Sequence, residues 1–312
     1  MKKIALSAVS LAALTTSVLA ADLPSRKAPA VPPPSPLSWT GFHVGLNAGG
    51  IWNNNNSIQV STWPIAQFAS ASPLFWAPLN GSISTGSNGG FIGGGQIGYD
   101  WQVPFSGMGF VAGVEADIQG IASSGGNNAR NVIYPGPVDG LQSTTFWNNA
   151  SGSASLQYLG TVRGRLGYLV NPTLLVYGTG GLAYGGVSAN LNQSQIYNLT
   201  YGSTPNALVI TAIGNANYSN TQVGYTAGGG LEWMFLPNWS AKAEYLYYNL
   251  GNVSMTSVMS ATASGPFAFN FPSGVVGVWT SSTANTTISG NVVRAGVNYH
   301  FNWGSAPVVA KY

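Results

Sequence analysis

The sequence predicts an all-β protein: a closed antiparallel transmembrane β-barrel of eight strands with long extracellular loops. Three observations lead to this prediction. Apolar and polar residues alternate along many short segments, charged residues make up only 5% of the chain, and the connections between segments alternate between short and long. Alternation with a period of two is the pattern of a strand whose faces meet different surroundings. Water on the outer face would select many charged residues there, so the composition favours lipid.

Residues 156–170 show the alternation best. Arg163 and Arg165 share one face with Gln157 and Thr161, whereas the residues between them are apolar or glycine. An arginine or lysine on the lipid face costs about 2–4 kcal/mol at the membrane midplane. A typical domain is stabilised by only about 5–15 kcal/mol in total. The charged face is therefore predicted to point into the lumen.

Four further segments place their charged residues on one face, and we expect these charges to pair inside the lumen. The predicted network consists of Glu115, Asp117, Arg163, Arg165, Glu232, Lys242, Glu244 and Arg294. The two acids of residues 107–120 are expected to meet the two arginines of the next strand. Glu232 is expected to pair with Lys242 across a tight turn. Glu244 is expected to pair with Arg294 on the last strand.

Two histidines, His43 and His300, lie on the inward face of the first and last predicted strands. Closure of a barrel makes these strands neighbours, so the two rings are expected to lie together near the periplasmic end. The sequence favours a shared plug of the lumen there over catalysis or metal binding. We predict no metal site and no cofactor. We also predict no catalytic residue, because no nucleophile, base and orienting group can be assembled at the outer rim.

Eight segments are long enough to cross a membrane as tilted strands, which need about 9–11 residues. They are residues 40–50, 91–103, 107–120, 156–170, 173–187, 222–235, 239–250 and 291–302. Tight turns containing Pro or Asn join three pairs of them, whereas four long connections are rich in Asn, Ser, Thr and Gly.

These four connections are residues 51–90, 121–155, 188–221 and 251–290. Short periplasmic turns and long external loops are typical of outer-membrane barrels. Apolar pieces at 207–213 and 275–279 are interpreted as strands that extend beyond the membrane, and a ten-stranded barrel is the alternative.

The two ends of the chain are predicted to lie outside the barrel. Residues 1–20 resemble a secretory signal peptide, with two lysines, a short apolar run and small residues before the cleavage point. Residues 21–38 are Pro-rich and predict an extended periplasmic linker. The barrel is assigned to residues 39–303 and a tail to residues 304–312. The chain has no cysteine, so attachment to the membrane by a lipid-modified cysteine is excluded.

Several motifs resemble the porin-like small outer-membrane β-barrel family of rhizobia and brucellae. They are the segments at residues 38–49 (SWTGFHVGLNAG), 162–168 (VRGRLGY), 178–185 (GTGGLAYG), 243–248 (AEYLYY) and 293–299 (VRAGVNY). The resemblance implies an OmpA-like eight-stranded barrel with surface-exposed, immunogenic or haemin-binding relatives. It also implies a sorting signal in the last strand, here Tyr299 and Phe301. The chain departs from the family pattern because residues follow Phe301, so Trp303 or Tyr312 could serve instead.

The function predicted from these observations is that of a non-enzymatic, integral protein of the Gram-negative outer membrane. Its role would be structural and in surface presentation, as a surface antigen, with the lumen closed by paired charges. The alternatives are a narrow porin-like channel and a surface adhesin or haemin-binding protein acting through its loops. The expected partners are outer-membrane lipid and lipopolysaccharide, the barrel-insertion machinery and a possible host or glycan ligand, but not nucleic acid.

Overall fold

The computed structural model describes residues 37–64, 80–85, 89–105, 108–123, 128–135, 142–266 and 275–301. The predicted signal peptide, most of the linker and the tail lie outside the described residues. The regular structure of the described part is one antiparallel sheet of eleven strands. They are β1 (Gly41–Asn53), β2 (Ser57–Pro64), β3 (Gly81–Ser84), β4 (Gly89–Phe105), β5 (Met108–Ser123), β6 (Asn128–Pro135), β7 (Gln142–Asn171), β8 (Leu174–Tyr201), β9 (Thr204–Leu236), β10 (Trp239–Ser264) and β11 (Val275–Phe301). Among these residues, no helix has the length and apolarity needed to cross a membrane.

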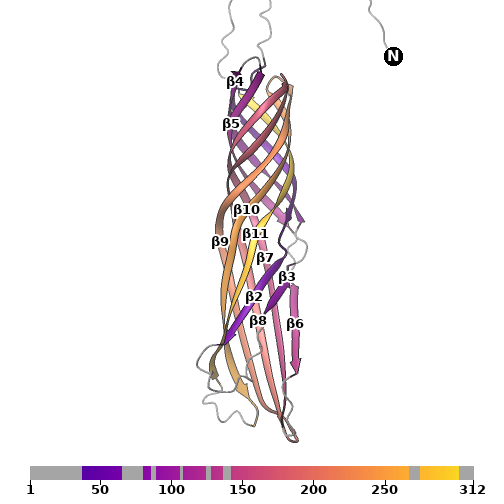
Figure 1. Cartoon of the computed structure of the whole chain (residues 1–312), viewed down its shortest axis with the longest axis vertical. Coiled ribbons are helices and arrows are strands. Elements are labelled where there is room, and N and C mark those ends of the chain that lie inside the picture. The colour runs from indigo at the N-terminus through magenta and orange to yellow at the C-terminus, as the bar shows by residue number, and fades with distance from the viewer. Residues whose placement is uncertain are drawn as a thin grey trace, which may run out of the picture. The chain divides into compact units, whose positions relative to one another are not determined.

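Eight of the strands form a closed ring. Their order around it is β1, β4, β5, β7, β8, β9, β10 and β11, and β1 pairs with β11 to close the barrel (Figure 1). Each of the eight segments predicted from the alternation lies on one of these strands. The eight-stranded prediction is confirmed, and the ten-stranded alternative is wrong for this ring. We call the end with the tight β7–β8 and β9–β10 connections the short-turn end.

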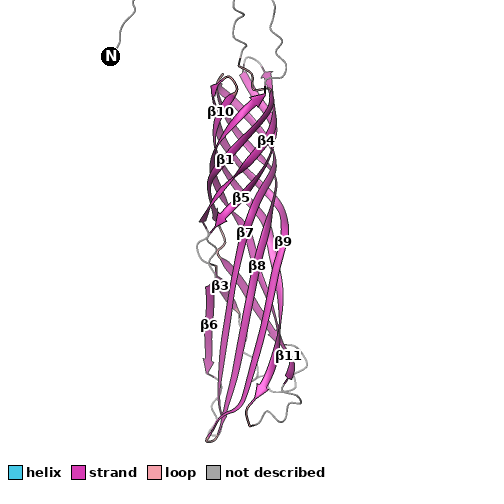
Figure 2. Cartoon of the chain, turned by 180° about the vertical axis from the view of Figure 1, so that it is seen from behind, coloured by secondary structure: helices cyan, strands magenta, loops and turns pink. Residues whose placement is uncertain are grey.

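Strands β7 to β11 continue far beyond the ring at the other end, which we call the extension (Figure 2). There β2 pairs with β11 in place of β1, β3 pairs with β2, and β6 pairs with β7 in place of β5. New strands thus cover the edges that β1 and β5 leave, which keeps the backbone groups hydrogen-bonded. The apolar pieces at residues 207–213 and 275–279 lie on β9 and β11, as predicted.

The prediction of four long loops is therefore wrong for most of the residues in these connections that the structure describes. The connection expected at residues 188–221 is strand throughout, except for a turn at Gly202 and Ser203. Asn, Ser and Thr are common in turns, which is why their abundance suggested loops. Here they occupy the outward positions of β8 beyond the ring, whereas Val187, Ala189 and Leu191 alternate with them and are buried.

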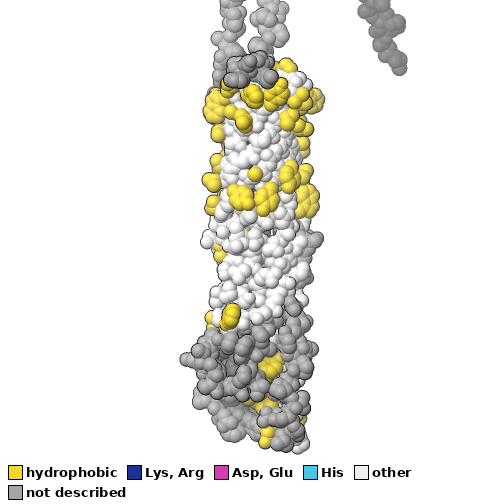
Figure 3. Space-filling view, in the orientation of Figure 1, with side chains coloured by type: hydrophobic (Ala, Val, Ile, Leu, Met, Phe, Trp, Pro, Cys, Tyr) yellow, Lys and Arg dark blue, Asp and Glu magenta, His cyan; other side chains and the backbone are white. Residues whose placement is uncertain are grey.

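The outer face of the ring is apolar, and its hydrophobic side chains gather in two bands (Figure 3). Leu46 and Leu166 are 74% and 64% exposed, and no Lys, Arg, Asp, Glu or His is visible on the described part of the face in view. At the short-turn end, Trp239, Tyr299 and Phe301 form successive edge-on ring contacts with centroids 5.2 and 5.0 Å apart. Such bands mark the two membrane interfaces of a barrel.

The interior contains apolar layers on both sides of the charged residues. At the short-turn end, Trp39, Val111, Leu169, Leu175, Tyr177 and Met234 form one buried cluster. Beyond the charged layer, a larger buried cluster includes Ile51, Ile92, Leu159, Val187 and Leu246 and continues into the extension. Small barrels leave room inside only for side chains, and here those side chains fill it in layers.

Two adjacent glycines of β4 differ in how closely the neighbouring backbone approaches them. A Cβ atom on Gly94, which faces inward, would lie 2.0 Å from the carbonyl oxygen of Ile118, whereas a Cβ on Gly95 would have its nearest contact at 3.7 Å. We expect Gly94→Ala to lower the free energy of unfolding by about 1–3 kcal/mol, because backbone would have to move. Urea unfolding in lipid vesicles measures this, with Gly95→Ala as the control. Equal effects of the two variants would contradict the prediction.

Candidate functional site

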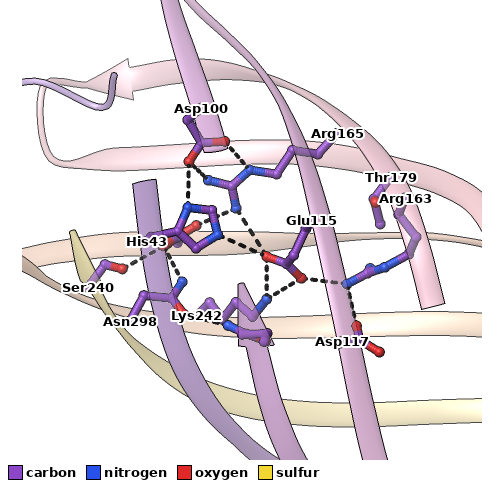
Figure 4. Close-up of polar contacts among 12 residues, drawn as sticks. His43, Asp100, Glu115, Asp117, Arg163, Arg165, Thr179, Ser240, Lys242 and Asn298 are labelled. Carbon is purple, nitrogen blue, oxygen red and sulfur yellow. Dashed lines mark hydrogen bonds and ion pairs between the residues drawn. The ribbon is translucent and has the colours of Figure 1, made fainter. Parts of the chain in front are cut away.

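The charged residues of the barrel meet in one buried layer of the lumen (Figure 4). The eight residues predicted from the sequence are joined by a ninth, Asp100 on β4, and we call the nine residues the ion cluster. Every member is at most 5% exposed. The strands supply these side chains at inward positions, because the apolar residues between them face the membrane. The cluster consists of Asp100, Glu115, Asp117, Arg163, Arg165, Glu232, Lys242, Glu244 and Arg294.

Arg163 on β7 connects three carboxylates. Its Nη2 lies 2.6 Å from Glu115 and 3.0 Å from Asp117, both on β5, and its Nη1 lies 2.8 Å from Glu244 on β10. Its Nε donates to the hydroxyl of Thr161 at 2.9 Å. The pairing predicted between Arg163 and the acids of the neighbouring strand is therefore present. The reach to Glu244 crosses the lumen and could not be predicted from strand order.

Arg294 on β11 repeats this arrangement from the opposite side. Its Nε donates to Glu244 at 2.8 Å, and its Nη2 donates to Asp117 at 2.8 Å. The predicted neighbours Glu244 and Arg294 are thus in contact. Glu244 also accepts a hydrogen bond from the Tyr177 hydroxyl at 3.2 Å. Each of these two arginines, and each of the acids Asp117 and Glu244, thus makes several hydrogen bonds. Hydrogen bonds between charged groups are stronger than those between neutral groups.

Arg165, the other arginine of β7, binds the residue that the sequence analysis missed. It donates to Asp100 through Nε at 2.7 Å and through Nη2, and to Glu232 through Nη1 at 2.7 Å. Glu115, its predicted partner, lies farther away, at 3.8 Å from Nη1. Asp100 lies at an inward position of β4, as does Gln96. This parity is the signal that could have identified it.

Lys242 has a different partner from the one predicted. We expected it to pair with Glu232 across the β9–β10 turn, and the two residues are indeed register neighbours. Instead, Nζ of Lys242 lies 2.8 and 2.9 Å from the two carboxylate oxygens of Glu115. Glu232 is occupied by Arg165, by the Ser240 hydroxyl at 2.5 Å and by the Asn298 amide at 2.7 Å. The long lysine side chain reaches across the lumen because the nearer carboxylate already has donors.

The two histidines lie side by side toward the short-turn end. His43 and His300 are register partners on β1 and β11, and their ring centroids are 5.5 Å apart. Trp39, which is 1% exposed, contacts His300 edge-on at 5.8 Å. Trp39 is held by a hydrogen bond from Nε1 to the carbonyl of Pro172 at 3.1 Å. Trp39 belongs to the apolar cluster of the short-turn end, so its contact with His300 joins that cluster to the histidine pair.

An amide chain completes the polar layer. Asn47 donates to Gln96 at 2.9 Å, Gln96 donates to Asn298, and Asn298 donates to Glu232. The sequence analysis did not select Asn47 or Gln96, because amides are common on strands of any kind. Their shared inward parity with His43 and Asp100 was the available signal.

The chemistry open to this site is limited by its burial. His43, Asp100 and His300 are buried and place one possible ligand atom each within 4.8 Å of the others. Both oxygens of Asp100 already accept from Arg165, however. Ser240 contacts Nε2 of His300 at 2.9 Å, but both side chains are at most 2% exposed.

The proposed sorting residues lie at the end of β11. Tyr299 and Phe301 stack edge-on at 5.0 Å among the aromatic residues of the short-turn end. Trp303 and Tyr312 lie outside the described residues.

Comparison with known proteins identifies the family. A family model described as the outer membrane protein beta-barrel domain matches residues 6–301. The 31 kDa outer-membrane immunogenic protein of Brucella melitensis biotype 1 is 30% identical over 303 residues, which cover 96% of this chain and 100% of that protein. The 22 kDa outer membrane protein of Rhizobium leguminosarum bv. viciae is 32% identical over 156 residues, which cover 49% of this chain and 51% of that protein.

Among solved structures, the outer membrane protein OprG of Pseudomonas aeruginosa aligns over 85% of this chain and 98% of its own, with 11% identity and a TM-score of 0.38. The family match over almost the whole barrel agrees with the ring of eight antiparallel strands. The chain therefore belongs to the outer membrane β-barrel protein family and is an outer-membrane protein.

Proposed function

We propose that this protein is a non-conducting barrel that anchors and presents a long β-structure at the cell surface. The observation that carries the proposal is the contact between Lys242 on β10 and Glu115 on β5, at 2.8 Å. These two strands are four places apart in both directions around the ring of eight. The bond therefore spans the lumen, which supports a barrel that is closed at this layer.

The layers above and below support the same conclusion. The apolar cluster around Trp39 and Leu175 lies on the short-turn side, and the larger apolar cluster lies on the other. A hydrated ion crossing the barrel would meet a buried apolar layer, a bonded ion cluster and a second apolar layer. Conduction through narrow pores needs sites that an ion can both enter and leave, which bonded side chains do not offer.

The conductance of the purified barrel in planar lipid bilayers tests this part of the proposal. We expect no unitary current steps, because the paired side chains occupy the lumen. Heat-modifiable migration on a gel and protease resistance of the same sample in vesicles serve as controls for folding and insertion. Stable steps of uniform size from a folded, inserted sample would overturn the proposal in favour of a narrow channel.

The extension suits presentation at the surface, where lipopolysaccharide and soluble ligands meet the protein. On β8, the outward positions beyond the ring carry Ser188, Asn190, Asn192 and Ser194. Side chains of this kind favour water. The alternating aliphatic residues continue the buried apolar cluster of the barrel into the extension. Such a structure holds its tip away from the membrane without a separate folded domain.

An epitope tag inserted between Gly202 and Ser203, at the tip of the β8–β9 hairpin, tests the orientation. We expect antibody to label intact cells that carry this variant, because a barrel with an even strand number and short periplasmic turns directs its long end outward. A tag between Ser106 and Gly107, in the short connection of β4 and β5, is the matched control. It should be labelled only after the outer membrane is permeabilised. The reverse labelling pattern would contradict the orientation.

A further inference from the structure

The ion cluster contains an excess of one negative charge. Five of its members are Asp or Glu and four are Arg or Lys. The acids are Asp100, Glu115, Asp117, Glu232 and Glu244, and the cations are Arg163, Arg165, Lys242 and Arg294. A buried charge without a partner is expensive, because the interior cannot solvate it as water does. With all five acids ionised, one further positive charge makes the layer neutral. Among the described residues, the remaining side chains of the layer that can gain a positive charge are His43 and His300.

The geometry of His43 distinguishes it from the other histidine. Its Nδ1 lies 3.3 Å from an oxygen of Asp100 on β4, and its Nε2 lies 3.4 Å from an oxygen of Glu115 on β5. An ionised carboxylate can only accept hydrogen bonds, and a neutral imidazole has only one N–H to donate. With one ring proton, placed on Nε2 toward Glu115, the lone pair of Nδ1 would lie 3.3 Å from a negatively charged oxygen of Asp100, in a geometry that forms no hydrogen bond. With two, both contacts are attractive.

The other groups around His43 do not supply the missing charge. Arg165 on β7 approaches the same two carboxylates, and it is already counted among the four cations. His300 on β11 has its ring centroid 5.5 Å away. Its Nε2 lies 2.9 Å from the Ser240 hydroxyl and 3.4 Å from Glu232, and its Nδ1 has no carboxylate within ion-pair distance in the described part of the chain. One ring proton is enough for His300.

We propose that His43 is a buried proton-binding site, which carries two ring protons in the folded barrel and supplies the fifth positive charge of the lumen. This site lies toward the short-turn end, and it makes the stability of the whole barrel depend on pH. Free histidine loses its positive charge near pH 6.5, so at neutral pH the folded chain holds a proton that the unfolded chain releases. Stability then falls as the pH rises. This inference is independent of the proposed absence of conduction, because the lumen could be closed whether His43 is neutral or positively charged.

Nitrogen NMR of histidine-labelled protein in lipid nanodiscs at pH 7.5 tests the charge state directly. We expect one histidine to show a bonded proton on each ring nitrogen and the other to show one proton only. The variant His300→Asn assigns the signals, because it should remove the singly protonated ring. Two neutral rings in the folded barrel would overturn the proposal. So would a Zn²⁺ titration that removes a ring proton and raises the unfolding temperature, because it would show a metal site at His43, Asp100 and His300.

A charge-balance experiment tests the energetic consequence. His43→Gln should lower the unfolding temperature in detergent by about 10 °C at pH 7, because it leaves one buried negative charge unpaired. In the background of Asp100→Asn, which removes one carboxylate, the same change should cost less than about 3 °C. Arg165 retains its bond to Glu232 in that background. Equal losses in both backgrounds would show that His43 contributes packing alone and would overturn the proposal.

The pH dependence provides an independent readout. Between pH 6 and pH 9, the unfolding temperature of the wild-type barrel should fall, and that of the His43→Gln variant should change less. The comparison uses the same chain, so the other titrating groups of the cluster are common to both samples. Parallel curves for the two proteins would place the pH dependence elsewhere and contradict the assignment to His43.

Discussion

Replacing Arg163 by methionine is expected to lower the free energy of unfolding by about 3–5 kcal/mol, a large part of the stability of a typical domain. Arg163 is 2% exposed and donates to Glu115, Asp117 and Glu244. Methionine fills a similar volume but leaves these buried carboxylates with fewer donors. The penalty comes mainly from the unpaired charges, since the side chain itself is replaced by one that packs well in an apolar core.

Urea unfolding in lipid vesicles, followed by tryptophan fluorescence, measures this loss. The charge-balanced variant Arg163→Met with Glu244→Gln is the control, because it removes one cation and one anion together. We expect the double variant to recover part of the stability, as neighbouring charges in one network do not act independently. A double variant less stable than the single one by the full cost of Glu244→Gln would show that the two groups act independently.

The inward and outward faces of the barrel could be predicted from the sequence, whereas the partners inside it could not. Parity assigns each residue of a strand to a face, and for Arg163 and Arg165 it does so correctly. It says nothing about how far a side chain reaches across the lumen. Lys242 passes its register neighbour and binds Glu115 on the opposite wall. Such choices depend on which carboxylates already have donors, and this is decided only when all eight strands are in place.

Strands beyond the membrane were predicted only at residues 207–213 and 275–279, and the rest of the extension was missed for a different physical reason. Polar residues on an outward face in water look like loop residues when only their composition is considered. A period of two persists through this segment, where Val187, Ala189 and Leu191 alternate with Ser188 and Asn190. This alternation indicates a strand and not a loop. In the membrane the outward residues are apolar, and beyond it they are polar. The same strand therefore changes its outer composition while its inward pattern continues.

Because the outer face meets lipid around the ring and water around the extension, an outward arginine should have very different costs at the two heights. Val162 on β7 is 52% exposed on the outer face and lies between the aromatic residues Tyr158 and Tyr168. Ile213 on β9 is 63% exposed, but it lies in the extension. We expect Val162→Arg to lower the free energy of unfolding in lipid vesicles by about 2–4 kcal/mol, the cost of an arginine at the membrane midplane. Ile213→Arg should change it by less than about 0.5 kcal/mol, as for an ordinary surface position.

The two variants are matched in chemistry and in exposure, so their difference measures only what lies outside the wall at each height. Equal costs would mean that lipid covers both positions or neither, and would contradict the division into ring and extension. Positions 162 and 163 also differ in how well each accommodates an arginine. An arginine is bonded to three carboxylates at 163 and would meet hydrocarbon at 162. Exchanging the two residues keeps the composition but moves the charge from the lumen to the lipid-facing side of β7. The exchanged variant should lose the three ion pairs and also place an arginine in hydrocarbon, so we expect it to fail to insert.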